Sequence, residues 1–154
     1  MAVARVKAAL AVAGLAAEIA EFPAGTRTAE DAARALGTTP GQIVKSLVFL
    51  ADGRPILALV SGANRVDLDK LAAAAGAQTI RKADAEAVRS FTGFAIGGVP
   101  PVGHRQTLPA FFDRDLLRYD LVYAAAGTPH AVFPIAPEAL LRASGAEEVD
   151  LREG

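Results

Sequence analysis

Two apolar runs that flank a two-residue turn constrain the fold of this chain most strongly. The segment LVFLADGRPILALV, residues 47–60, carries apolar side chains on both sides of Asp52-Gly53. An Asp-Gly pair favours the tight turn of a β-hairpin, because both positions tolerate positive φ angles. The segment therefore predicts two antiparallel strands that meet at this turn.

A lysine interrupts the apolar run QIVKSLVFL of residues 42–50. In a strand, Lys45 shares a face with Ile43, Leu47 and Phe49. An unpaired buried ammonium is costly, so the side chain must reach water, pair with a carboxylate or face a cavity that takes an anion.

The residues before this run carry the signals of a short helix. The sequence predicts Thr39 as the N-cap, Pro40 at the first helical position and Gln42 as the residue that completes a capping box. We therefore expect Lys45 at the junction of a helical turn and a strand, where its side chain can face a cleft.

Short helices and strands alternate irregularly along the rest of the chain. A helical period from Val3 ends at Gly14, and the stretch from Leu15 to Phe22 can extend before Pro23. The remaining expected helices are 28–37, 66–76, 84–93, 113–119 and 137–145, and the remaining expected strands are 78–80, 120–126, 130–135 and 147–151. This order predicts an α/β (α+β) domain with a mixed, mostly antiparallel sheet or barrel surrounded by short helices.

Length and composition predict one compact domain that spans residues 1–154. Hydrophobic residues make up 52% of the chain and charged residues 21%, which is typical of a folded protein with a substantial core. The formal charge of −1 does not indicate a general attraction to nucleic acid, although a local basic patch is compatible with it. The chain has no cysteine and two histidines, so we expect no metal and no other cofactor.

The chain shows no pattern of a membrane span or an export signal. The alanine-rich N-terminal run has charged residues close on both sides and lacks a leader's apolar middle and cleavage site. We therefore expect a cytoplasmic protein without a membrane partner.

Three stretches carry residues that could do chemistry. They are Lys45-Ser46, the glycine- and proline-rich loop 97–103, and the segment from Gly127 to His130. Glycines let backbone N–H groups approach a ligand, yet such a loop is also common as a tight structural turn. His130 could orient water or a ligand amine, and it could equally be an ordinary surface histidine. No nucleophile elbow or catalytic triad surrounds a serine.

Taken together, these stretches resemble one known family. The segments TRTAEDAARALG, QIVKSLVF, LVSGANRVDLDKL, TGFAIGGVPPVGH and AAGTPHAVF follow the order found in the YbaK/ProX family. These proteins are free-standing relatives of the editing domain of bacterial prolyl-tRNA synthetases, and the resemblance covers residues 20–150. It implies a trans-editing deacylase that hydrolyses the ester of mischarged tRNA, with tRNA-Pro carrying a small wrong amino acid as the expected substrate.

The resemblance also implies roles for individual residues. Lys45, His130 and Gly98 are the candidate catalytic residues. Lys45 would bind the acceptor end of the tRNA, and the backbone N–H groups of Gly97-Gly98 would stabilise the ester carbonyl. The candidate substrate-binding residues are Ser46, Phe49, Val60, Ile96, Gly97, Pro100, Pro101, Gly127 and Thr128. Mischarged tRNA is the expected partner, and prolyl-tRNA synthetase and a second copy of the chain, as a homodimer, are further candidates. In family members the residue after the lysine and the presence of the histidine vary with the amino acid removed, so the residue removed stays open.

Two other functions compete with this interpretation. One is a nucleic-acid-binding protein without enzymatic activity, although the chain shows neither a basic recognition helix nor an aromatic stacking array. The other is a small-ester hydrolase or a binding module that uses the same pocket. A panel of mischarged tRNAs and free aminoacyl esters separates the three.

Overall fold

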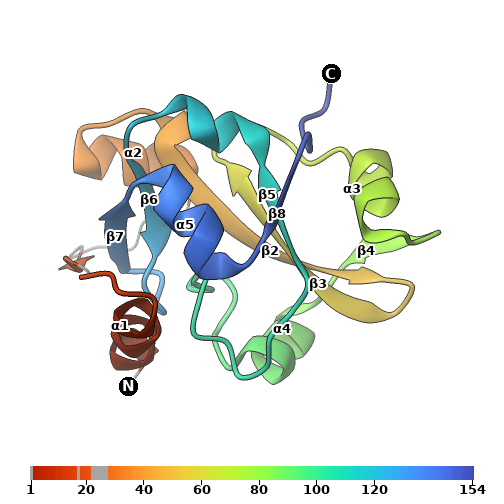
Figure 1. The fold of residues 1–154 in the computed structure, drawn as a ribbon, viewed down its shortest axis with the longest axis horizontal. Coiled ribbons are helices and arrows are strands. Elements are labelled where there is room, and N and C mark those ends of the chain that lie inside the picture. The colour runs from red at the N-terminus through yellow and green to blue at the C-terminus, as the bar shows by residue number, and fades with distance from the viewer. Residues whose placement is uncertain (1, 17, 22–27) are drawn as a thin grey trace.

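A computed structural model describes residues 2–16, 18–21 and 28–154 of the 154-residue chain. The helices are α1 (Ala2–Val12), α2 (Ala29–Leu36), α3 (Leu68–Ala75), α4 (Ala85–Thr92) and α5 (Pro137–Ser144), with 3₁₀ turns η1 (Pro40–Gln42) and η2 (Arg114–Arg118). The strands are β1 (Ala20–Glu21), β2 (Ile43–Ala51), β3 (Arg54–Ser61), β4 (Ile80–Lys82), β5 (Ala110–Asp113), β6 (Val122–Ala125), β7 (Ala131–Ile135) and β8 (Glu147–Val149). Figure 1 shows their arrangement.

Local sequence signals account for most of these element boundaries. The Thr28 side chain accepts a hydrogen bond from the Asp31 backbone N–H at 3.0 Å and so caps α2, as predicted. The Gln42 side chain accepts from the Thr39 backbone N–H at 3.3 Å, as expected of the glutamine that completes a capping box with Thr39. Asp52 and Gly53 adopt φ angles of +49° and +84°, which is the turn geometry that the β2–β3 hairpin requires.

The strands of the described residues form one mixed sheet. The order is β1-β7-β6-β2-β3-β5-β8, and β4 pairs with β2 beside this path. Pairs β1–β7, β6–β7, β2–β3 and β2–β4 are antiparallel, whereas β2–β6, β3–β5 and β5–β8 are parallel. The predicted class, a mixed and mostly antiparallel sheet with short helices around it, is confirmed.

One edge of β2 is shared by two strands that leave a gap between them. On the side away from β3, β6 pairs with residues 43–44 and β4 pairs with residues 49–51. Between these pairings the Ala83 backbone N–H donates to the carbonyl oxygen of Val48 at 3.2 Å. The edge of β2 around residues 45–47 therefore has no neighbouring strand on this side within residues 2–16, 18–21 and 28–154.

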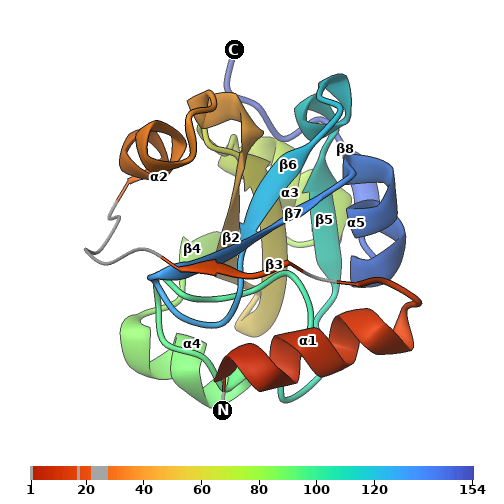
Figure 2. The same ribbon diagram turned by 90° about the vertical axis from the view of Figure 1, so that its left-hand side faces the viewer.

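Helices cover both faces of the sheet. Residues of α1, α4 and α5 belong to the larger buried cluster, together with Val44 and Val48 of β2. Residues of α2 and α3 cover the opposite face in two smaller clusters, one around Ile43 and one around Phe49. Lys45 lies between these two clusters in the strand. Figure 2 shows α1 and α2 at opposite ends of the molecule.

Some predicted boundaries differ from the structure. The expected extended stretch from Leu15 is a strand only at Ala20–Glu21, and its end at Phe22 lies outside the described residues. The strand expected at 78–80 lies at Ile80–Lys82, because the Asp52 carboxylate binds the backbone N–H groups of residues 78 and 79. Strand β5 was not predicted. No helix of the described part is long and apolar enough to cross a membrane.

Candidate active site

A cavity of about 630 Å³ opens at the unpaired edge of β2. Its size is in the usual range for a small-ligand site. Strand β2 forms the floor, and the walls come from the start of α2, the loop after β3, the end of β4, α4, the 96–99 loop and the β6–β7 turn. The wall residues include Glu30, Arg65, Lys82, Val88, Ile96, Gly97, Val99, Tyr123, Ala125, Thr128 and Pro129.

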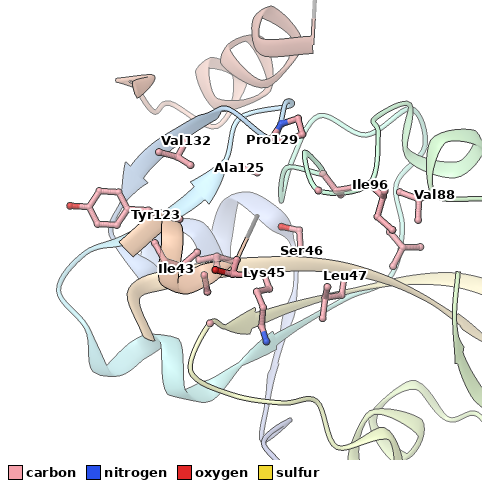
Figure 3. A pocket seen from close by; sticks show the side chains of 18 of the residues that line it. Ile43, Lys45, Ser46, Leu47, Val88, Ile96, Tyr123, Ala125, Pro129 and Val132 are labelled. Carbon is pink, nitrogen blue, oxygen red and sulfur yellow. The ribbon is translucent and has the colours of Figure 1, made fainter. Parts of the chain in front are cut away.

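The exposed edge of β2 gives the cavity two chemically different halves. Successive strand side chains point to opposite faces, so Ser46 and Lys45 face opposite ways. Figure 3 shows Ser46 directed toward Ile96 and Pro129, and Lys45 and Leu47 directed away from them. The Ser46 half is mainly apolar, whereas the Lys45 half carries charge.

Lys45 is half-buried and tied to the loop after β3. Its Nζ donates a hydrogen bond to the Asn64 backbone carbonyl at 2.6 Å. Burial lowers the pKa of Lys45 below its ordinary value, and the carboxylates of Glu30 and Asp113 oppose this shift because they favour the ammonium. A cation that has lost part of its hydration beside a cavity is well placed to bind an anion.

The carbonyl that binds Lys45 is itself held in place. Asn64 Nδ2 donates to the carboxylates of Asp113 and Asp115, at 2.9 Å each. Asp113 is 1% exposed and also accepts from the Ser61 backbone N–H at 3.0 Å. These bonds fix the loop, and the loop carbonyl in turn fixes the ammonium of Lys45.

Ser46 provides an unused polar atom in the apolar half. Its Oγ is shielded from solvent and has no hydrogen-bond partner within the described part of the chain. A buried hydroxyl without a partner costs about 1–3 kcal/mol, so such an atom calls for an explanation. Here a bound ligand can supply the missing partner.

The two loops opposite β2 pack directly against each other. A Cβ on Gly98 would lie 2.7 Å from Thr128 Cα, so only glycine allows this approach. The Gly98 backbone N–H donates to the Ala95 carbonyl at 3.0 Å, which leaves it occupied in a turn. The structure thus differs from the expectation that this N–H faces the ester carbonyl.

Helix α1 supports both loops from outside the cavity. A Cβ on Gly127 would lie 2.9 Å from the Ala2 backbone, and one on Gly103 would lie 3.3 Å from the Arg5 carbonyl oxygen. The Arg5 guanidinium also stacks over the Phe94 ring at 5.2 Å. The position of α1 therefore sets the position of the cavity wall.

His104 anchors the far end of the glycine-rich loop. Its Nε2 donates to the Pro100 carbonyl oxygen, and its ring centroid lies 6.0 Å from that of Phe94. Burial lowers the pKa of His104, although the bond to Pro100 acts in the opposite direction. The hydrogen bond and the ring contact hold the His104 side chain within the loop packing.

The structure brings half of the sequence-predicted residues to the cavity. Those in the lining are Lys45, Ser46, Phe49, Ile96, Gly97 and Thr128, and those outside it are Gly98, Val60, Pro100, Pro101, Gly127 and His130. Two opposing segments, β2 and the loop that carries Ile96, Gly97 and Val99, therefore meet at one cavity.

The residues outside the lining have identifiable positions. Val60 is fully buried on the face of the sheet that α3 covers, and it is the partner of Lys45 in the β2–β3 pairing. Gly127 packs on α1, and Pro100 is buried and bonded to His104. Pro101 lines a second cavity of about 210 Å³. His130 is exposed in the turn before β7, where its backbone N–H donates to Thr128 Oγ1 at 3.3 Å.

Several lining residues were not singled out from the sequence. Glu30, Arg65, Lys82 and Tyr123 line the cavity, and each belongs to a segment far from Lys45 in the chain. Arg65 lies within LVSGANRVDLDKL, one of the segments that resemble the family. The described residues contain no group of three or more His, Cys, Asp or Glu side chains that could hold a metal ion.

Fold and cavity together define a class of protein. The class is a small mixed α/β domain whose cavity has a mainly apolar half and a charged half. Comparisons with known proteins make this class specific.

The sequence model of the aminoacyl-tRNA editing domain family matches residues 23–143. The chain therefore belongs to this family, and the predictions of the family and of an aminoacyl-tRNA editing enzyme are confirmed. A candidate Cys-tRNA(Pro)/Cys-tRNA(Cys) deacylase, EbsC of Enterococcus faecalis, is 30% identical over 115 residues, which are 74% of this chain and 70% of that protein.

Two further comparisons match a whole solved chain and one part of a larger enzyme. A crystal structure of a candidate trans-editing enzyme for prolyl-tRNA synthetase has a TM-score of 0.94 and 51% identity, covering 99% of this chain and 98% of that one. The proline–tRNA ligase of Nitratidesulfovibrio vulgaris is 37% identical over 66% of this chain. The match spans 18% of that ligase, so it concerns one part of a larger enzyme.

Proposed function

We propose that this protein hydrolyses, in trans, the ester between tRNA-Pro and a small wrong amino acid. The observation that carries the proposal is the cavity at the edge of β2, with an apolar half beside Ser46 and a half-buried ammonium, Lys45, in the other half. The editing-domain family and relatives described as acting for prolyl-tRNA synthetase or on Cys-tRNA(Pro) support the choice of tRNA.

The substrate would lie across the strand edge. Its amino acid side chain enters the half formed by Ser46, Val88, Val99 and Ala125, and its terminal nucleotide lies in the half of Lys45. Small and apolar lining residues leave room for a small side chain. The ammonium of Lys45 attracts the phosphate of the terminal nucleotide.

The reaction needs water but no covalent intermediate. A water oxygen bonds to the ester carbonyl carbon, the bond from this carbon to the ribose oxygen breaks, and the ribose hydroxyl is restored. The amino acid leaves as its carboxylate, and one proton goes to solvent. The lining that the structure describes contains one carboxylate, Glu30, and no histidine. We therefore assign the orientation of water to the substrate's neighbouring ribose hydroxyl, helped by the fixed geometry of the cavity.

Two partners follow from the proposal. Mischarged tRNA forms in the cytoplasm, so the protein would act there. Prolyl-tRNA synthetase, as the source of the error, would be the enzyme that this activity complements.

The decisive experiment uses Lys45→Ala with a panel of substrates. Wild type and variant are incubated with tRNA-Pro charged with alanine, cysteine, serine or proline, and with free aminoacyl esters. We expect wild type to release the small wrong residues. Loss of a charge-stabilising side chain should lower kcat/KM on the order of 10²-fold. The free energy of unfolding should change by about 1 kcal/mol or less.

Lys7→Ala serves as the control, because Lys7 is exposed on α1 and does not line the cavity. Binding of tRNA without turnover by wild type would refute the proposal in favour of a binding protein. Turnover of free esters alone would identify a small-ester hydrolase. Retained activity in Lys45→Ala with a much lower melting temperature would make the lysine structural.

A further inference from the structure

The charges of the cavity differ from those of the whole chain. Its described lining carries three cations, Lys45, Arg65 and Lys82, and one carboxylate, Glu30. The chain as a whole has a formal charge of −1. A protein without an overall attraction for polyanions therefore concentrates positive charge at one opening.

Arg65 and Lys82 have no carboxylate partner among the residues that the structure describes. The Arg65 backbone carbonyl accepts from the Glu153 N–H at 3.0 Å, so its loop is fixed while its side chain is exposed. Lys82 is exposed at the end of β4. Neither side chain forms an ion pair with any residue that the structure describes. Both cations are therefore available to an anionic ligand.

The three cations come from different parts of the cavity lining. Lys82 pairs with Phe49, which shares the face of Lys45 and lies four residues further along the strand. At about 3.3 Å per residue, the two positions are roughly 13 Å apart. Arg65 follows Asn64, whose carbonyl binds Lys45. Such spacing suits successive anionic groups of one extended ligand better than a single anion.

We propose that Arg65 and Lys82 bind backbone phosphates of the single-stranded 3′ end of tRNA, beyond the nucleotide at Lys45. The inference rests on the deacylase function proposed above and adds the way in which the nucleic acid is held. Contact is limited to about three phosphates. Counterion release for a single strand then gives a slope of about −2 in log(kcat/KM) against log[salt], from about −0.7 per contact.

The test compares Arg65→Gln, Lys82→Gln and the double variant with wild type. Two substrates are used, alanyl-tRNA-Pro and alanyl-adenosine, which keeps the ester but has no phosphate. Each single variant should lower kcat/KM for the tRNA substrate about fivefold at low salt. This factor corresponds to the loss of one exposed ion pair worth about 1 kcal/mol. Each should also reduce the salt slope by about 0.7. Turnover of alanyl-adenosine should not change.

Arg142→Gln and Lys7→Gln are the matched controls, because both side chains are exposed on helices away from the cavity lining. Neither should alter the salt slope. Fluorescence anisotropy of a labelled single-stranded RNA ending in CCA repeats the measurement without turnover. The same change in slope is expected for its dissociation constant.

The outcomes separate this inference from the proposed function. An unchanged slope in both cavity variants, or an equal loss on alanyl-adenosine, would overturn phosphate binding by these residues. A wild-type slope much steeper than −2 would indicate additional phosphate contacts elsewhere on the protein. It would overturn the proposal that contact is limited to about three phosphates. If wild type turns over neither substrate, the deacylase function fails, and the anisotropy slopes still decide the role of Arg65 and Lys82.

Discussion

Replacement of Gly98 by alanine tests whether contact between two loops shapes the active site. The new Cβ would lie 2.7 and 2.8 Å from Thr128 Cα and C, and 3.0 Å from Pro129 N. Carbon atoms pack at about 3.5–4.0 Å, so one loop must retreat by roughly 1 Å. Backbone atoms on both sides, and α1 behind Gly127, resist this movement.

The expected effects follow from this displacement. Overpacking costs about 1–3 kcal/mol, and the lower entropy of alanine in the unfolded chain returns about 0.4–1 kcal/mol. We expect a net loss of about 1–2 kcal/mol in the free energy of unfolding, measured by urea titration. A shift of about 1 Å in a cavity wall should lower kcat/KM about 10²-fold. Single-turnover deacylation of alanyl-tRNA-Pro measures this loss.

Gly145→Ala is the matched control for stability. Gly145 has a φ angle of +66° at the end of α5, and a Cβ there would meet no atom within 4 Å. Alanine in this left-handed conformation costs about 1–2 kcal/mol without touching the cavity. Wild-type kcat/KM in Gly98→Ala would refute the reasoning. Recovery of activity on adding Thr128→Ala would also refute it, because the crowding involves backbone and not the threonine side chain.

Three further substitutions give distinct results. Ser46→Ala should leave the free energy of unfolding unchanged or raise it by up to about 1 kcal/mol, because the variant removes a hydroxyl that has no partner within the described part of the chain. Its kcat/KM should fall about 5- to 100-fold. A variant with lower stability and full activity would contradict this prediction. Folding lowers the pKa of His104, so this histidine binds a proton more readily in the unfolded chain. The free energy of unfolding should therefore decline as the pH falls below about 6.5, the ordinary pKa of histidine. Urea titrations at several pH values should show a weaker decline for His104→Gln. His130→Ala should reduce kcat/KM by less than the roughly 10²-fold expected for a general acid or base, because the exposed His130 ring lies outside the cavity lining. A larger loss together with an altered pH–rate profile would identify His130 as a catalytic residue.

Elements with local signals could be predicted from the sequence. The caps at Thr28 and Gln42 and the turn at Asp52-Gly53 depend on neighbouring residues, and each lies where expected. Strand β5 has no such signal, because Ala110–Asp113 is short, buried throughout and parallel to both neighbours. Without alternation of polar and apolar residues, its sequence does not distinguish a strand from a buried loop.

The candidate site could be predicted only in part for a similar reason. Lys45 and Ser46 stand out in an apolar run, and the glycines mark a loop. Val60 is opposite Lys45 in the hairpin, yet packing of α3 removes it from the cavity. Lys82 reaches the cavity through the pairing of β4 with β2, which no local pattern specifies, and Arg65 reaches it through the course of the loop after β3.

The gap beside β2 also has a consequence for solubility. An open strand edge can pair with the edge of another molecule, and proteins usually cover or shorten such edges. Here the gap is only a few residues long, and the loops that carry Ile96 and Thr128 stand over it as cavity walls. The same loops that shape the pocket thus shield a site of self-association. Variants that displace them should aggregate on mild heating sooner than their loss of stability alone predicts.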